Sequence, residues 1–491
     1  MKLNSANLSS IARSVPTPTY DRSALRAGIV HIGVGGFHRA HQAMYLDALF
    51  NDGRDLDFGV VGVGLLPQDS RMRDVMQAQD CLYTLVEKSP SGSRRPRVIG
   101  SMVRYLFAPD APEAVLSALV DPAIRIVSLT ITEGGYPVKQ SSGEFDGTDA
   151  SIRTDLRPGA PPRSAFGYLT EALARRREAG TDPFVVMSCD NIPHNGRLAR
   201  EALTAFARLR DEELADWIEK EVSFPGSMVD RITPVTSDLD RVRLARDSGI
   251  EDTWPVGCEP FTQWVLEDRF PIGRPALERV GVQMVDDVEP YELMKLRLLN
   301  AGHQALCYLG HLSGARHIHE ICQDPLFVRF LRGYMDHEAT PTLPPVPGVD
   351  LAHYKAQLIE RFANPAIGDT LDRLCAQTSD RIPKFLLPVT HRRLDDRGDV
   401  HRSALVVASW ARYAEGTGEN GEPIDVVDRR RDELMARATR YREDPLAFLD
   451  DRELFGDLRD NPRFTRPYLE ALESLHRVGA RATLERWESR R

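Results

Sequence analysis

The first half of the chain alternates short apolar runs with amphipathic segments. A β-rich run at 29–34 leads through a glycine cluster into a helical pattern with apolar positions at Ala40, Met44 and Leu49, and a second apolar run follows at 58–65. This order predicts the first βαβ unit of a doubly wound parallel sheet. Further elements of this half are predicted as strands at 81–86, 124–130 and 183–189 and as a helix at 165–179.

Beyond about residue 287 the strand pattern fades and helical periodicity takes over. Helices are predicted at 291–312, 324–335, 351–362, 404–414, 428–442 and 467–486. A chain of 491 residues is also too long for one ordinary core. We therefore expect an α/β, doubly wound Rossmann-type domain over 1–287 and a mostly α-helical substrate and catalytic domain over 288–491, with the ligand crevice between them.

Composition narrows the class of protein. The 63 Lys and Arg against 72 Asp and Glu give a formal charge of −9, which disfavours a nucleic-acid partner. No run approaches the roughly 18 apolar residues of a membrane span, and the N-terminus lacks an apolar signal core. The six cysteines are scattered without a CxxC pair, so neither a zinc knuckle nor a disulfide framework is indicated. These features predict a soluble cytoplasmic protein with no membrane or nucleic-acid partner.

The glycine cluster after the first predicted strand is a candidate nucleotide-binding turn. Glycines without side chains let a pyrophosphate approach the backbone, and the following helix offers free amides to it. The residues in question are Gly33, Gly35, Gly36 and Phe37. The pattern departs from G-x-G-x-x-G because His38 stands at the third glycine position. A tight structural turn is the alternative interpretation.

Asp69 is the candidate acid for the adenosine ribose. It follows the second predicted strand, where a carboxylate accepts hydrogen bonds from ribose hydroxyls. Its separation from Gly33 exceeds the usual spacing of about 20 residues. The alternative role is an N-cap for the helix that begins beside it.

Polar residues follow two more predicted strands. Glu133 and Gly134 lie in a loop directly after the strand at 124–130, and Asn191 follows the strand at 183–189. Doubly wound sheets place their ligands at the carboxyl ends of strands, so these residues are site candidates. A turn-forming asparagine is the alternative at Asn191.

The predicted helix at 291–312 carries the strongest catalytic candidates. Helical spacing places Glu292, Lys295 and His303 on one face, with Asn300 a little to the side. An amine, an amide and an imidazole together could hold an alcohol and take its proton. The chain has only seven lysines against 56 arginines, which draws attention to a lysine in an apolar segment. The alternatives are a surface Glu–Lys pair and a hydrogen-bonded core histidine.

Other chemistries lack their motifs. The HIHE segment is not HExxH, and the sequence contains neither a GxSxG elbow nor a P-loop. We therefore predict no metal site and no serine nucleophile. A non-enzymatic nucleotide sensor stays open as an alternative, since it would need the glycine turn but not the face with Lys295.

Several long motifs in one order resemble the mannitol dehydrogenase family of long-chain, zinc-independent polyol dehydrogenases and reductases. They are IVHIGVGGFHRAHQA, SLTITEGGY, SCDNIPHNG, FPGSMVDRITP, CEPFTQWVLED and the segment from Lys295 to His303. The resemblance covers essentially the whole chain. It implies NAD as cofactor, a polyol or ketose as substrate, a monomer, and interconversion of D-mannitol and D-fructose. A hexuronate ketose reductase, acting on fructuronate or tagaturonate, and a D-arabinitol dehydrogenase are the alternatives within enzymes.

The resemblance also implies roles for individual residues. Lys295 is expected to be the general base, which must be neutral near the working pH, and Glu292 is placed by its spacing to pass the proton on. Asn191 and Asn300 are expected to donate to the developing oxyanion, and His303 to bind and orient substrate. Expected contacts to the substrate chain are Asp230, Arg373, Arg381, where the family has a lysine, and Lys384. Gln68 replaces an acid of strict NAD users, so some tolerance of NADP is expected.

Overall fold

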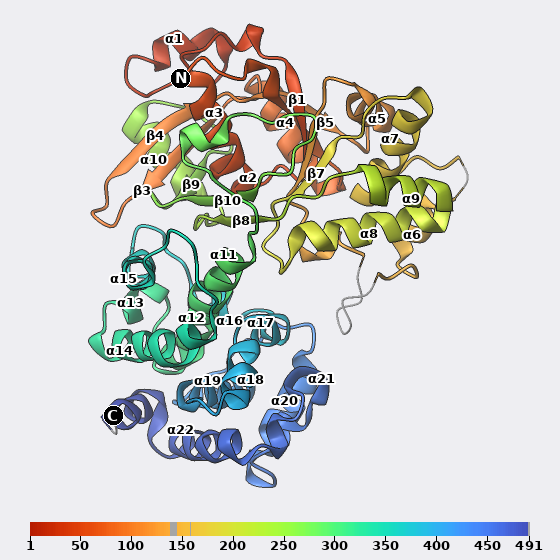
Figure 1. Cartoon of the computed structure of the whole chain (residues 1–491). Coiled ribbons are helices and arrows are strands. Elements are labelled where there is room, and N and C mark those ends of the chain that lie inside the picture. The colour runs from red at the N-terminus through yellow and green to blue at the C-terminus, as the bar shows by residue number, and fades with distance from the viewer. Residues whose placement is uncertain (138–144, 158, 490–491) are drawn as a thin grey trace. The chain divides into compact units, whose positions relative to one another are not determined.

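The computed structural model describes residues 1–137, 145–157 and 159–489. The chain divides into two compact units. The first comprises Met1–Ser89 and Ser93–Val288, and the second comprises Glu289–Arg491 with the short stretch Pro90–Gly92. The first unit runs from red to green in Figure 1, and the second continues from green to blue.

The first unit is built on a five-stranded parallel sheet with the order β5-β2-β1-β6-β7. Its strands are β1 (Ala27–Ile32), β2 (Gly59–Gly64), β5 (Met102–Phe107), β6 (Ile126–Leu129) and β7 (Val185–Ser188). The strands β2 and β5 follow β1 on one side and β6 and β7 lie on its other side, so the strand order reverses between β1 and β6. This is the switch point where doubly wound sheets bind ligands. The predicted Rossmann-type sheet is thereby confirmed.

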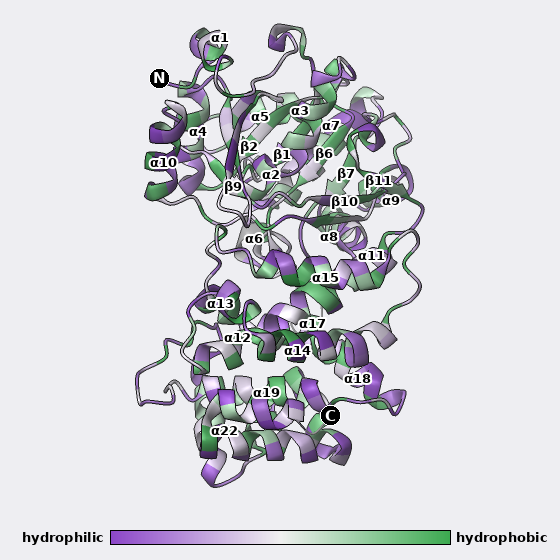
Figure 2. Cartoon of the chain, turned by 90° about the vertical axis from the view of Figure 1, so that its left-hand side faces the viewer, coloured by the Kyte–Doolittle hydropathy of each residue, from purple (hydrophilic) through white to green (hydrophobic). Residues whose placement is uncertain are grey.

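Side chains of the sheet alternate between two hydrophobic cores. Ile29 of β1 belongs to the core that contains α3 (Gln42–Asn51) and α4 (Ser70–Ala78), and its neighbour Val30 belongs to the core on the other face. That second core holds α5 (Pro112–Val120), α7 (Ala165–Ala179), α8 (Asn195–Arg210) and α9 (Glu212–Glu221). Because both faces are covered, the strands are mostly apolar, apart from polar residues such as His31 in β1 and Ser128 in β6. Much of the sheet has the hydrophobic colour in Figure 2.

Two small sheets complete the first unit. One has the order β4-β3-β9 and the other the order β11-β10-β8. Their strands are β3 (Tyr83–Lys88), β4 (Arg94–Ile99), β8 (Ser227–Asp230), β9 (Val256–Cys258), β10 (Gln263–Glu267) and β11 (Gln283–Val285). The strand predicted at 81–86 is therefore present as β3, but it belongs to a small sheet. The remaining helices of the unit are α1 (Leu8–Ile11), α2 (Gly36–Ala40), α6 (Ala150–Asp155) and α10 (Asp238–Ser248).

The second unit is mostly helical in its described part, with loops between the helices, and the fold-class prediction is confirmed there too. The helices up to α16 are α11 (Glu289–Met294), α12 (Ala301–Leu312), α13 (Ile318–Cys322), α14 (Pro325–Tyr334), α15 (Leu351–Phe362) and α16 (Leu371–Cys375). The others are α17 (Thr378–Phe385), α18 (Leu387–Asp395), α19 (His401–Ala414), α20 (Arg431–Ala438), α21 (Arg452–Phe455) and α22 (Pro462–Ser489). Eleven of the twelve residues of α12 are buried, and this helix contacts α14, α16 and α19.

The prediction of one uninterrupted α-helix at 291–312 is wrong. Lys295–Asn300 forms a π-helix, η7, between α11 and α12, and the amide of Ala301 donates to the carbonyl of Leu296 five residues earlier. A second π-helix, η8, spans Met335–Ala339. Regular apolar periodicity cannot reveal such a turn, because the extra residue changes the phase of the pattern locally. Within the described ranges no helix is long and apolar enough to cross a membrane.

Candidate active site

The glycine turn follows β1 at the switch point of the sheet. Gly33 has φ +96°, and a Cβ atom there would lie 2.2 Å from the carbonyl oxygen of Thr130. Glycine is therefore required at this position by both backbone conformation and space. Gly35 is different, because a Cβ atom added there would lie 3.8 Å from the nearest heavy atom, the carbonyl oxygen of Gly33. The backbone at Gly35 is accessible to a ligand, as a pyrophosphate-binding turn requires.

His38 occupies the third glycine position for a structural reason. Its ring stacks on that of His31 in β1, with centroids 3.5 Å apart. His31 in turn contacts the hydroxyls of Ser128 and Thr130 at 2.8 and 2.9 Å, and Thr130 donates to the carbonyl of Gly33 at 2.7 Å. Burial lowers the pKa of His31 to about 3 and that of His38 well below its usual value, so both rings are neutral. The stacked pair fills the space between helix and strand that a glycine would leave.

The helix predicted after the glycine turn is broken in two. α2 ends at Ala40, His41 has φ −127° and ψ −92°, and α3 begins at Gln42. Nε2 of His41 donates to the carbonyl oxygen of Gln263 at 2.9 Å, and the ring stacks on Phe37 with centroids 4.9 Å apart. These contacts hold the half-buried ring of Phe37 beside the turn.

Asp69 lies after β2, as the sequence predicts, but it does not cap the next helix. Its Oδ2 accepts from the amide of Leu66 at 2.9 Å, and its side chain makes no capping bond to α4. The N-cap interpretation is therefore wrong in the structure. The half-buried carboxylate closes the turn after β2 and keeps an oxygen for a further hydrogen bond.

The ends of β6 and β7 are joined by an aspartate that the sequence analysis missed. Asp190 is buried and accepts hydrogen bonds from the amides of Ile131 and Thr132, in the loop that carries Glu133 and Gly134. Glu133, Gly134 and Asn191 are all exposed. The signal for Asp190 was an acid directly after an apolar strand, where an ionisable side chain is costly without partners. Asp230 of the first unit is buried at the end of β8.

In the second unit the π-helix changes the relation of Lys295 to Asn300. In a regular α-helix two residues five apart point about 140° away from each other. A π turn joins residues five apart, so it brings them to nearly the same side. Lys295 and Asn300 begin and end this segment and are each 8% exposed. The π turn thus brings Asn300 closer to the side of Lys295 than an α-helix would, the predicted convergence of the two side chains stays a prediction, and Glu292 is buried in α11 just before them.

His303 and Asn300 each carry a buried polar atom without a hydrogen-bond partner in the described part of the chain. These atoms are His303 Nε2 and Asn300 Oδ1. The His303 ring stacks on Phe362 of α15 with centroids 4.0 Å apart. Burial lowers the pKa of His303 to about 3, so the ring is neutral and can accept or donate one hydrogen bond at each nitrogen. Buried polar atoms left open in this way favour a site for hydroxyl groups.

The predicted cations of the second unit have different surroundings. Arg373 binds both oxygens of Asp369, at 2.6 and 2.5 Å, which orients its half-exposed guanidinium. Arg381 donates to the carbonyls of Arg373 and Leu374 at 3.0 and 3.1 Å, and Lys384 is exposed. Arg373 and Arg381 thus form one connected group close to His303, whose electrostatic environment includes both.

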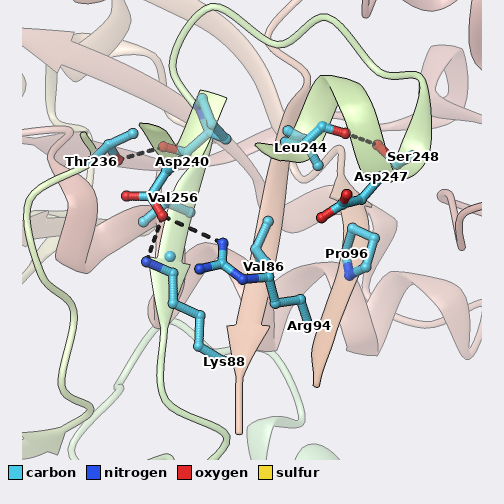
Figure 3. A pocket seen from close by; sticks show the side chains of 12 residues that line it. Val86, Lys88, Arg94, Pro96, Thr236, Asp240, Leu244, Asp247, Ser248 and Val256 are labelled. Atoms are coloured by element: carbon cyan, nitrogen blue, oxygen red, sulfur yellow. Dashed lines mark hydrogen bonds and ion pairs between the residues drawn. The ribbon is translucent and has the colours of Figure 1, made fainter. Parts of the chain in front are cut away.

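Burial alone does not single out Lys295 among the seven lysines. Lys88 and Lys355 are also buried, and each forms an ion pair, Lys88 with Asp240 at 2.8 Å and Lys355 with Asp336. Figure 3 shows Lys88 in a pocket beside α10, where Arg94 also reaches Asp240. None of the residues predicted for the site lines this pocket. Among the described residues no group of three or more His, Cys, Asp or Glu could hold a metal ion.

Two family models match the chain. They are the mannitol dehydrogenase Rossmann domain, over residues 27–279, and the mannitol dehydrogenase C-terminal domain, over residues 287–476. The mannitol 2-dehydrogenase of Aspergillus fumigatus is 48% identical over 498 residues, which cover 99% of each chain. That of Phaeosphaeria nodorum is 47% identical over 491 residues, covering 99% of this chain and 86% of the relative.

Solved structures agree with these matches. The mannitol 2-dehydrogenase of Pseudomonas fluorescens, in a ternary complex with NAD and D-mannitol, is 48% identical, with a TM-score of 0.92 and full coverage of both chains. A D-sorbitol dehydrogenase in substrate-free form is 38% identical, with a TM-score of 0.89 and coverage of 99% and 100%. The resemblance predicted from the motifs is confirmed, and the chain belongs to the mannitol dehydrogenase family.

Proposed function

We propose that this protein is an NAD-dependent mannitol 2-dehydrogenase that interconverts D-mannitol and D-fructose. The observation that carries the proposal is the 48% identity, over the full length, with the Pseudomonas fluorescens enzyme whose structure holds NAD and D-mannitol. A nucleotide sensor would have no need for the buried face with Lys295, Asn300 and His303, which favours an enzyme.

The residues of the first unit fit a dinucleotide. Gly33 permits the turn and Gly35 leaves the backbone open, so Gly33, Gly35, Gly36 and Phe37 would hold the pyrophosphate. Asp69 would accept from the adenosine ribose, and Glu133 and Gly134 would flank the cofactor at the end of β6. When bound, NAD accepts a hydride from the carbinol carbon of the substrate. With Gln68 beside Asp69, we propose that some use of NADP persists.

Lys295 is the proposed general base. Its neutral amine takes the proton of the reacting hydroxyl, and its burial keeps bulk water from competing for that hydroxyl. Glu292, one helical turn earlier and also buried, then carries the proton towards solvent. An amine base and amide donors together supply what a Lewis-acid metal would, so we propose that the reaction needs no metal.

Amide and imidazole groups bind the reacting oxygen. Asn191 and Asn300 donate from Nδ2 to the oxygen as negative charge develops on it, while neutral His303 binds and orients the substrate. Asp230, Arg373, Arg381 and Lys384 are the proposed contacts to the remaining hydroxyls. Arg373 is already oriented by Asp369, which lowers the conformational entropy that it loses on binding.

A substrate comparison tests the proposed reaction. NADH formation is followed with D-mannitol, D-arabinitol and D-sorbitol, and NADH consumption with D-fructose and fructuronate. We expect the highest kcat/KM for D-mannitol and D-fructose. D-sorbitol is the second candidate, because a D-sorbitol dehydrogenase is 38% identical to this chain. A higher kcat/KM with fructuronate would replace the proposal by a hexuronate reductase.

Replacement of the base tests the mechanism. Lys295→Ala should lower mannitol oxidation by about 10²–10⁴-fold and leave the Kd of NADH nearly unchanged. Asn191→Ala and Asn300→Ala should each lower it by about 10²–10³-fold, the scale of one oxyanion donor. The matched control is Lys355→Ala, which removes another buried lysine of the same unit and should keep kcat. A Lys295→Ala variant with more than a tenth of the original rate and an unaltered pH profile would exclude Lys295 as the base.

A further inference from the structure

The carboxylate of Asp190 binds the loop that follows β6. Asp190 is 6% exposed and lies at the carboxyl end of β7. Its Oδ1 accepts from the amide of Thr132 at 2.7 Å, and its Oδ2 accepts from the amide of Ile131 at 3.2 Å and the hydroxyl of Tyr136 at 2.9 Å. One side chain thus fixes both ends of the loop that contains Glu133 and Gly134.

The loop needs this support because its backbone is strained. Thr132 has φ +60° and ψ 174°, a region that is occupied almost only by glycine. A residue with a side chain stays there only when its surroundings hold it. The shortest of the three hydrogen bonds to Asp190 comes from the amide of Thr132 itself.

The backbone of Asp190 is fixed as well. Nδ2 of Asn195 donates to the carbonyl of Asp190 at 3.1 Å and to that of Ser227 at 2.6 Å, and the amide of Ser227 returns a bond to Oδ1 of Asn195 at 3.0 Å. Tyr136 also shares a hydrogen bond with Ser188 of β7 at 2.7 Å. The peptide that precedes Asn191 is therefore joined to β7, β8 and the loop after β6.

We propose that Asp190 is a positioning residue, which sets the loop of Glu133 and Gly134 for the cofactor and the backbone of Asn191 for the reacting oxygen. The proposal rests on the function proposed above. Burial raises the pKa of Asp190 to about 6, so the carboxylate is largely ionised at neutral pH and can accept all three bonds. An asparagine side chain could not accept all three bonds, because its Nδ2 is a donor and would face the N–H of an amide or the hydroxyl of Tyr136.

The test compares two buried aspartates of the first unit. Asp190→Asn should raise the Kd of NADH about tenfold and lower kcat for mannitol oxidation at least tenfold, the scale of a lost charge-assisted hydrogen bond. The KM for mannitol should change less than kcat, because no substrate contact is removed. The matched control is Asp47→Asn in α3. Asp47 is 3% exposed and accepts from the hydroxyl of Tyr20 at 2.7 Å and the amide of Gly100 at 2.9 Å, at the amino ends of the strands.

Asp47→Asn should lower the melting temperature as Asp190→Asn does, yet keep kcat and the Kd of NADH. If both variants lose NADH affinity and kcat equally, or if Asp190→Asn keeps both values, the positioning role is excluded. Tyr136→Phe removes one of the three bonds and should shift both values in the same direction by a smaller factor, which keeps the test decisive if Asp190→Asn does not fold. Failure of the proposed function would appear separately, as absence of mannitol oxidation in the unsubstituted protein.

Discussion

Replacing Gly33 by alanine should destabilise the first unit, and the structure sets the size of the effect. Alanine at φ +96° has a left-handed backbone, which costs about 1–2 kcal/mol. Its Cβ would also lie 2.2 Å from the carbonyl oxygen of Thr130. That atom belongs to the backbone and cannot rotate away, so relief requires a shift of the chain, at about 1–3 kcal/mol. The sum is about 2–5 kcal/mol in the free energy of unfolding.

The same substitution at Gly35 should separate binding from stability. Gly35 has φ −115°, and the nearest heavy atom to the added methyl group would be 3.8 Å away. We expect a change in stability of at most about 0.5 kcal/mol, as for an unconstrained surface position. The methyl group would nevertheless occupy the space in which a pyrophosphate approaches the backbone. Gly35→Ala should therefore raise the Kd of NADH at least tenfold.

Calorimetry and fluorescence titration with NADH check both variants. Gly33→Ala should lower the melting temperature of the first unit by roughly 4–10 °C, and Gly35→Ala should leave it almost unchanged. An unchanged melting temperature for Gly33→Ala would refute the steric argument. Undiminished NADH affinity in Gly35→Ala would refute the placement of the pyrophosphate at this turn.

Three further results are expected. Asp69→Ala should reduce the preference for NAD over NADP by about 1–3 kcal/mol, measured as the ratio of the kcat/KM values for the two cofactors. The reason is that the removed carboxylate accepts from the 2′-hydroxyl of NAD and repels the 2′-phosphate of NADP. Equal kcat/KM values for both cofactors in the unsubstituted protein would contradict this. Activity should survive dialysis against EDTA, and a loss that zinc restores would show that the proposed metal-free chemistry is wrong. Burial lowers the pKa of His303 from 6.5 to about 3. Below pH 6.5 the unfolded chain therefore binds a proton that the folded chain does not, and the free energy of unfolding decreases as the pH is lowered. Between pH 7 and pH 5 this contributes about 2 kcal/mol, so His303→Gln should lose stability less steeply over that range, and an identical slope would exclude the contribution.

The sequence predicts elements well where one local pattern decides them. The helices expected at 165–179 and 351–362 occur with those bounds, and four of the five strands of the main sheet lie within about two residues of their predicted ranges. The fifth, β5, was not predicted. Apolar period and capping residues are sufficient for this. They do not say which strand pairs with which, so β3 could be recognised as a strand without its place in a small sheet.

The site was less accessible to prediction wherever distant residues decide it. Asp190 shows its role only through amides nearly sixty positions earlier in the chain. His38 departs from a motif because of a partner in β1. The scarcity of lysine drew attention to Lys295, yet Lys88 and Lys355 are buried as ion-paired residues that the same argument would have selected.

The π-helix allows Lys295 and Asn300 to lie near one side of the helix although they are five positions apart in the sequence. Its wider turn accommodates one residue more than an α-helical turn does. A relative that lacks one residue from the stretch matching Leu296–Leu299 could close this segment into an ordinary α-helix. Its lysine and asparagine would then be four residues apart, only about 40° around the axis, and would still share one side. In an alignment of relatives, a gap of one residue at this place is therefore compatible with an intact site. A gap of two residues is compatible as well, because it leaves the lysine and the asparagine three apart, about 60° around the axis. A gap of three residues would leave them two apart, about 160° around the axis, and would turn the amine away from the amide.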